Sequence, residues 1–359
     1  MFALLVAVGA LHKPTCTVAA RCGPSWHASP RSIVAMQSAA SPAESAPSSE
    51  RLLKLSLFAG VTYSSLASGA SVGKVMGLKV VAGSLAATLP GVFDSPQADF
   101  AVTWRPFGYG LAMMWMGGLF LPACKGSPSF LLAFAYMLYG LKVVLFQRAR
   151  NARPDYIEKA LAPTRAKQPP STSLPARLSV VIFIGLLLAT FSFPLHAASY
   201  VTATGLPSEW GRRAWGVLYG TGAALFSLLI QTVADVQKFK HKAREGADAP
   251  CLGGLWSLTR HPNYLGEIGF QLGVLGAGLS GCTSIASGWL SLLAPVTSIS
   301  IMLAATRRLE AQQKEAYGGQ PEYAAYLRST QRLLVDWKQV TVATFLWIFP
   351  GGWGRNSTK

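Results

Sequence analysis

The stretch "GLWSLTRHPNYLGEIGF", residues 254–270, places charged side chains at the start of a long apolar run. Pro262 lacks a backbone N–H and is favoured in the first turn of a helix, so the residues after it predict a helix. The free N–H groups and the dipole at such a helix end favour anions. Arg260 and His261 therefore form a candidate site for a phosphate or a carboxylate.

The helix predicted after Pro262 carries polar side chains inside an apolar sequence. Asn263 and Glu267 are four residues apart, and Tyr264 and Glu267 three apart, so they share one helix face. A membrane-edge anchor would account for Arg260 and for an interfacial Tyr264. It does not account for Glu267, because an acid within an apolar helix is costly and usually functional. Four glycines on this helix allow close approach of a neighbouring helix or a flat ligand: Gly266, Gly269, Gly273 and Gly276.

The composition indicates a membrane protein. Hydrophobic residues make up 51% of the chain and charged residues 13%, against roughly 25% charged in soluble proteins. The net charge of +17 comes from basic residues in short loops between apolar runs. This distribution favours a membrane with anionic headgroups over nucleic acid. The five cysteines form no CxxC pair, so neither a disulfide framework nor a metal site is expected.

Apolar runs recur along the chain, and several reach the length of about 20 residues that a spanning helix needs. They lie near 52–69, 75–93, 108–123, 128–147, 178–199, 213–234, 264–281, 284–305 and 340–350. We therefore predict an all-α bundle of about seven to nine transmembrane helices, with a cofactor pocket between the C-terminal helices.

The basic loops of this bundle are predicted to share one side of the membrane. If residues 264–305 form a helical hairpin, the loops 148–177, 235–260 and 306–338 all face the cytosol or stroma. Residues 306–338 are expected to form an amphipathic helix with a polar turn at "YGGQPEY".

The N-terminus has the composition of a targeting segment. Residues 2–11 are apolar but too short to span, and the next forty residues are rich in Ser, Ala and Pro and poor in acids. We expect residues 1–50 to be a presequence resembling a bipartite plastid leader. This predicts a plastid membrane, with the endoplasmic reticulum as the alternative. The rest divides into N-terminal membrane segments at 51–99, a transmembrane domain at 100–338 and a tail at 339–359.

Two further polar clusters follow apolar runs. In "ADVQKFKHK", residues 234–242, Asp235 and Lys238 are one turn apart and could form an ion pair. In "RRLEAQQKEAYGGQPEYAAYLRST", residues 307–330, Tyr323 and Tyr326 lie on one helix face. Taken alone, these clusters suit a helix-end ion pair with basic anchors and an amphipathic surface helix.

Together the three blocks, in their order and spacing, resemble the C-terminal half of the steroid 5α-reductase-like membrane proteins. The most similar branch is the uncharacterised DUF1295-type branch. "FLLAFAYMLYGLKVVLFQRARNARPDY", residues 130–156, is similar to that branch's upstream segment. The resemblance covers roughly residues 100–338. It implies a helical membrane fold that encloses NADPH and an enzyme that reduces a carbon–carbon double bond in a sterol- or prenyl-like lipid.

The resemblance also implies site residues. By position, three residues would hold the cofactor: Asp235, Asn263 and Glu267. Six more residues are expected to contact the cofactor. Looser positional matches indicate Lys238, Arg308 and Tyr326, and helix-end electrostatics indicate Arg260, His261 and Tyr264.

The implied reaction delivers a hydride to the β-carbon of an enone, while a hydrogen-bond donor polarises the carbonyl group. In the steroid reductases proper, a Glu/Gln–Tyr pair on earlier helices supports this step. No acid lies inside an apolar run before residue 200, so the sequence assigns no such pair. The candidate donors are Tyr109, Tyr139 and Gln271, with Tyr136 and Gln231 as further polar positions.

Two other functions stay open. Membrane isoprenylcysteine- and phospholipid-type methyltransferases share an "RHPxYxG" core and bind S-adenosylmethionine. Glu267 directly after Gly266, together with Asn263, favours the reductases. The third possibility is a non-catalytic membrane scaffold. In each case the expected partners are the bilayer and a hydrophobic, lipid-like ligand.

Overall fold

The computed structural model describes residues 71–88, 105–153, 174–201, 208–246 and 249–333. Within these ranges every regular element is a helix and no strand occurs. Nine of the helices have eight or more residues, which confirms the predicted all-α fold. The presequence, the tail and the apolar runs 52–69 and 340–350 lie outside these ranges. Plastid delivery stays a prediction, which a fluorescent fusion of residues 1–50 would test.

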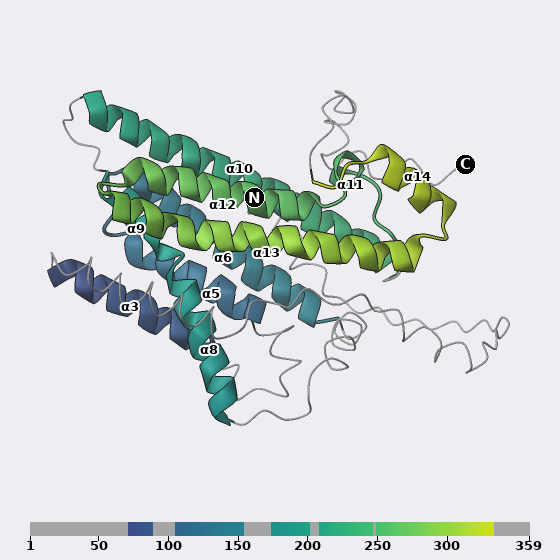
Figure 1. Ribbon diagram of the computed structural model, residues 1–359, viewed down its shortest axis with the longest axis horizontal. Helices are drawn as coiled ribbons and strands as arrows, with labels where there is room; N and C mark the ends of the chain where they lie inside the picture. Colours follow the sequence, from purple (N-terminus) through teal and green to yellow (C-terminus); the bar gives the residue numbers. More distant parts are fainter. Residues whose placement is uncertain (1–70, 89–104, 154–173, 202–207, 247–248, 334–359) are drawn as a thin grey trace.

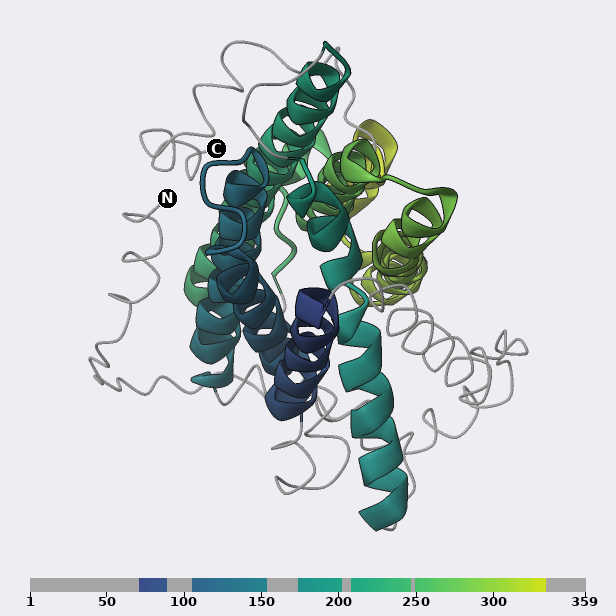
Figure 2. The same ribbon diagram turned by 90° about the vertical axis from the view of Figure 1, so that its left-hand side faces the viewer.

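The helices form a layered bundle (Figures 1 and 2). Their bounds are α3 Ser71–Thr88, α5 Arg105–Phe120, α6 Ser129–Asn151, α8 Leu174–Ala189, α9 Ser192–Ser199, α10 Ser208–Glu245, α11 Leu255–Leu258, α12 Pro262–Gly281, α13 Ile285–Tyr317 and α14 Pro321–Ser329. Helices α10, α12 and α13 lie side by side, α5 packs on α6, and α3 packs on α8. Helix α6 contacts α10 and so joins the pair of α5 and α6 to the layer of α10, α12 and α13.

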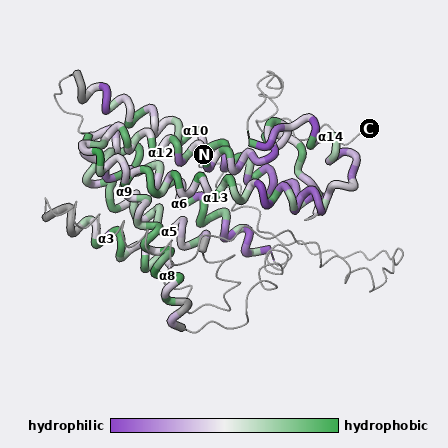
Figure 3. Tube along the Cα trace, in the orientation of Figure 1, coloured by the Kyte–Doolittle hydropathy of each residue, from purple (hydrophilic) through white to green (hydrophobic). Residues whose placement is uncertain are grey.

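Among the described residues, four helical segments are long and apolar enough to cross a membrane: Ser129–Asn151, Leu178–Ser199, Gly211–Glu245 and Ile285–Tyr317. The chain is therefore a multi-pass membrane protein. Its hydrophilic residues gather at one end of the bundle, on the C-terminal parts of α10 and α13 and on α14 (Figure 3). The predicted hairpin is confirmed, because α12 and α13 pack together and are joined by the short connection at residues 282–284.

Helices α10 and α12 pack very closely. A Cβ atom at Gly273 would lie 2.5 Å from the backbone nitrogen of Ala224 on α10. Gly266 and Gly269 also face α10 too closely for a side chain, whereas Gly276 has open space around it. Three of the four predicted contact glycines thus bring α12 onto α10. The polar side chains of the two helices meet as a result.

Within the segment 306–333, the polar turn predicted at "YGGQPEY" is present, and the helix before it is the continuation of the apolar helix. Helix α13 continues without a break from Ile285 to Tyr317, turns at residues 318–320 and is followed by α14. The first helix breakers after the apolar run are Gly318 and Gly319, so nothing stops the helix at the change from apolar to polar residues. A 33-residue helix is about 50 Å long, longer than the roughly 30 Å hydrocarbon core. Its C-terminal half therefore extends beyond the bilayer.

Candidate functional site

Helix α12 begins at Pro262, with His261 as its N-cap residue, as the sequence predicted. Its polar residues recur at intervals of four and face polar residues of α10 and α6. These residues form two buried clusters about one helical turn apart, together called the buried polar network. The first is Glu267, Gln271, Gln231 and Tyr139, and the second is Asn263, Asp235 and Lys142.

Glu267 lies at the deep end of this network and is 5% exposed. Its Oε2 accepts hydrogen bonds from the Tyr139 hydroxyl at 2.6 Å and from Nε2 of Gln231 at 2.7 Å. Its Oε1 accepts from Nε2 of Gln271 at 2.9 Å and from the Ser298 hydroxyl at 3.5 Å. Both carboxylate oxygens are thus held by donors from four helices.

The three hydrogen-bond donors predicted from the sequence lie around Glu267. Tyr139 donates to Glu267, and Gln271 bridges Glu267 to the hydroxyl of Tyr109 at 3.3 Å. The hydrogen bond between Tyr139 and Glu267 pairs an acid with a tyrosine, a pairing that the sequence did not predict because the acid lies on α12, 128 positions after the tyrosine on α6.

A second acid lies further toward the polar end. Asp235 Oδ2 pairs with the Lys142 ammonium at 2.5 Å, and Asp235 Oδ1 accepts from Nδ2 of Asn263 at 3.2 Å. The predicted pairing of Asp235 with Lys238 is wrong, since Asp235 faces α6. The Lys238 ammonium instead lies 4.9 Å from the centre of the Trp256 ring. Residues three apart on a helix diverge by about 60°, which lets them face different neighbours.

Lys142 was not predicted as a site residue. It is 5% exposed and lies in the middle of an apolar run, three residues after Tyr139. A lysine at that depth is itself a functional signal, so the sequence contained the information needed to find it.

The amide side chains around the two acids leave three acceptors unused. Gln231, Asn263 and Gln271 each turn an N–H toward a carboxylate, which fixes the orientation of the amide group because only the nitrogen can donate. Their carbonyl oxygens are buried and have no hydrogen-bond partner among the described residues. Leaving a buried acceptor unpaired costs about 1–3 kcal/mol. A ligand with N–H or O–H donors would satisfy them.

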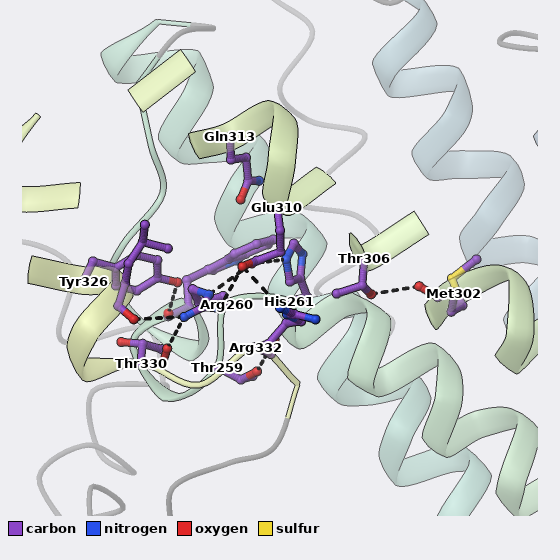
Figure 4. A network of polar contacts seen from close by, with 12 residues as sticks. Thr259, Arg260, His261, Met302, Thr306, Glu310, Gln313, Tyr326, Thr330 and Arg332 are labelled. Carbon is purple, nitrogen blue, oxygen red and sulfur yellow. Dashed lines mark hydrogen bonds and ion pairs between the residues drawn. The ribbon is translucent and has the colours of Figure 1, made fainter. Parts of the chain in front are cut away.

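At the polar end, Arg260 and His261 bind an anion that belongs to the protein itself (Figure 4). Nε and Nη2 of Arg260 donate to the two carboxylate oxygens of Glu310 at 3.0 and 2.7 Å, and Nε2 of His261 lies 2.7 Å from Oε1. Nη1 of Arg260 donates to the carbonyl oxygens of Leu327 and Thr330. We call this group of contacts the Glu310 clamp. It fastens α13 and the end of α14 to the start of α12.

Burial lowers the pKa of His261 below its ordinary value, although Glu310 opposes this effect. The ring is therefore mainly neutral at pH 7. The ring of Tyr264 stacks on it with centroids 5.6 Å apart. Arg308 is exposed. Of these predicted residues, His261 is thus part of the clamp, Tyr264 packs on it and Arg308 lies near Tyr264.

A cavity of about 250 Å³ opens at the polar end, between α10, α13, α14 and the loop before α11. Its basic lining residues are Lys238, Lys242 and Arg260, and its aromatic ones are Trp256, Tyr317, Tyr323 and Tyr326. No acid lines it within the part of the chain that the structure describes. Three predicted cofactor contacts come together here: Lys238, Arg260 and Tyr326. The Tyr326 hydroxyl donates to the Trp256 carbonyl oxygen at 2.6 Å, which shapes the wall.

Metal chemistry has no candidate centre in the described ranges, where no group of three His, Cys, Asp or Glu side chains could hold a metal ion.

These features define an all-helical, multi-pass membrane protein with polar groups buried between its C-terminal helices. The chain belongs to the family described as "Protein of unknown function (DUF1295)", whose model matches residues 99–330. Comparison with the curated proteins gave no match. Comparison with the solved structures also gave no match.

Proposed function

We propose that the protein is a membrane-embedded, NADPH-dependent reductase of a carbon–carbon double bond in an enone or a sterol- or prenyl-type lipid. The observation that carries the proposal is the Glu267 network, in which an acid–tyrosine pair lies beside unused hydrogen-bond acceptors. The cluster of Asn263, Asp235 and Lys142 lies about one helical turn nearer the polar end, where the basic cavity lies.

The residues present fit a dinucleotide with phosphate groups. Lys238 and Lys242 would hold phosphates, and the tyrosine and tryptophan rings of the cavity would pack against a purine base. Deeper in, the free carbonyl oxygens of Asn263 and Gln231 would accept from a carboxamide or from ribose hydroxyls. Asp235, paired with Lys142, offers its carboxylate to the same groups.

When bound, NADPH would supply the hydride that reaches the β-carbon of the substrate. The protein would supply the hydrogen-bond donor that stabilises enolate charge on the substrate oxygen. Tyr136 is already committed, because its hydroxyl donates to the carbonyl of Phe191 at 2.8 Å. Tyr139 is committed to Glu267. Tyr109 is half-buried and accepts from Gln271, so its own proton can be donated to a substrate carbonyl.

The second candidate function is an S-adenosylmethionine-dependent methyltransferase. One observation favours it: Glu267 has no cationic partner among the described residues and would suit a sulfonium cation. The cavity favours the reductase instead, because three basic residues and no described acid line it. Phosphate groups gain from that lining, whereas the amino group and sulfonium of S-adenosylmethionine do not.

The test is the thermal stability of the detergent-purified full chain with NADPH, NADH or S-adenosylmethionine. A ligand at 100 times its dissociation constant adds about 2.7 kcal/mol to the stability of the native state. We expect stabilisation by NADPH and none by S-adenosylmethionine. Stabilisation by S-adenosylmethionine alone would assign the methyltransferase. No response to any of the three would assign the non-catalytic scaffold.

Turnover then tests the role of Tyr109. NADPH oxidation, followed by absorbance during a screen of enone lipids, should slow about 100-fold or more in Tyr109→Phe. NADPH-dependent stabilisation should not change in this variant. Tyr219→Phe is the matched control, because Tyr219 is largely exposed. Equal turnover in the two variants would remove Tyr109 from the reaction.

A further inference from the structure

Glu267 differs from the other acids of the site in having only neutral partners. Asp235 is paired with Lys142, and Glu310 is paired with Arg260. Within the described ranges, Glu267 takes part in no ion pair, and its four hydrogen-bond partners are two amides and two hydroxyls. It is also the most buried of the three acids, at 5% exposure.

The partners of Glu267 are those of an ionised carboxylate. Each of its oxygens receives one glutamine N–H, from Gln231 on Oε2 and from Gln271 on Oε1. An amide N–H can only donate, so both oxygens act as acceptors. The hydroxyls of Tyr139 and Ser298 add to the same two oxygens. A carboxylic acid has a proton on one oxygen and would gain less from this arrangement.

A buried negative charge without a cation is costly, and unused hydrogen-bond acceptors lie beside it. The carbonyl oxygens of Gln231 and Gln271, next to Glu267, are buried and have no partner among the described residues. Acceptors and a carboxylate together suit a ligand that brings both hydrogen-bond donors and positive charge.

We infer that Glu267 is a charge-selecting residue, which binds the positively charged member of a cofactor pair more tightly than the neutral member. The identity of the pair rests on the proposed function. In the reductase, the nicotinamide ring is neutral in NADPH and positive in NADP⁺. In the alternative, S-adenosylmethionine carries a sulfonium that S-adenosylhomocysteine lacks.

For the reductase this assigns Glu267 a part in the chemistry. When bound, NADPH would supply a hydride to the substrate β-carbon, water would supply the proton for the α-carbon, and the nicotinamide would be left oxidised and positively charged. The fixed charge of Glu267 would favour that positive form. In this role Glu267 acts through its charge, and the proton for the α-carbon comes from water.

The experiment measures dissociation constants of NADP⁺, NADPH, S-adenosylmethionine and S-adenosylhomocysteine with the detergent-purified full chain. Wild-type protein should bind the positive member of its pair about tenfold more tightly or better, a difference of about 1.4 kcal/mol. Glu267→Gln keeps the size of the side chain and removes the charge, so the preference should disappear. Lys242→Gln is the control, because losing a lysine from the basic cavity should weaken the binding of both members of a pair alike.

The wild-type measurement already tests the inference if Glu267→Gln does not fold. Equal affinity for NADP⁺ and NADPH would overturn the charge-selecting role and leave the reductase proposal standing. Preference for S-adenosylmethionine over S-adenosylhomocysteine, with neither nicotinamide form bound, would support the charge-selecting role and overturn the reductase proposal. Failure of both pairs to bind would overturn both.

Discussion

Glu267 and Glu310 are glutamates in the same helical layer with opposite surroundings. Glu310 receives a bidentate arginine and a histidine, so its charge is balanced within the protein. Glu267 receives only amide and hydroxyl donors, so its charge is not balanced among the described residues. The comparison separates two uses of one side chain. The first fastens secondary-structure elements together, and the second prepares a binding site.

The position of each acid along its helix explains the difference. Glu310 lies on the part of α13 that extends past the bilayer, opposite the start of α12 where Arg260 and His261 stand. Glu267 lies in the second turn of α12, between α6, α10 and α13. Cations are costly at that depth, and the one that is present, Lys142, pairs with Asp235.

The largest expected effect on stability comes from leaving a second buried acid without a cationic partner. Lys142→Met would leave the buried Asp235 without its cation. Breaking a buried pair by removing one partner costs about 3–5 kcal/mol. We expect a strongly lowered unfolding midpoint in detergent, with Lys125→Met as the control because Lys125 is exposed.

Adding Asp235→Asn to Lys142→Met removes the stranded charge and should restore much of the lost stability. Cofactor binding should not return in this double variant, since the Asp235 carboxylate is a proposed ligand group. If Lys142→Met and Lys125→Met unfold alike, the ion pair contributes nothing.

An intermediate effect is expected from opening the Glu310 clamp. Glu310→Ala leaves Arg260 and His261 without their shared carboxylate. Hydrogen bonds to charged groups contribute about 1.5–3 kcal/mol each. We expect faster proteolysis and faster hydrogen exchange across residues 318–332, with α12 still protected.

Glu315→Ala is the matched control for the clamp, because Glu315 is an exposed acid on the same helix. The comparison of the two glutamates predicts that the charge preference assigned to Glu267 survives in Glu310→Ala. Loss of that preference would mean that the two acids act as one unit.

The smallest expected effect is a change in how the unfolding midpoint depends on pH. Burial keeps the folded-state pKa of His261 below its ordinary value of about 6.5. The unfolded chain therefore binds a proton before the folded protein does as the pH falls, so stability is present above about pH 6.5 and declines below it. His261→Gln should flatten the unfolding midpoint measured between pH 7.5 and 5.5. An unchanged slope would show that other groups carry the dependence.

The sequence predicted local features of the site better than its pairings. Pro262 correctly marked the start of α12, and the four-residue spacing correctly placed Asn263 and Glu267 on one face. The pairing of Asp235 was predicted from its nearest basic neighbour along the helix, Lys238. Its actual partner is 93 positions away.

The sequence by itself determined the helical class, the membrane setting, the hairpin of α12 and α13 and the depth of Glu267. These follow from the length and period of apolar runs, which depend on the bilayer and on backbone geometry. Only the tertiary structure decided which acids have a cationic partner: Lys142 pairs with Asp235 and Arg260 with Glu310, whereas Glu267 receives the neutral Tyr139. Those choices depend on how α6, α10 and α13 pack around α12. That packing is set by contacts between segments far apart in the chain, which local periodicity does not encode.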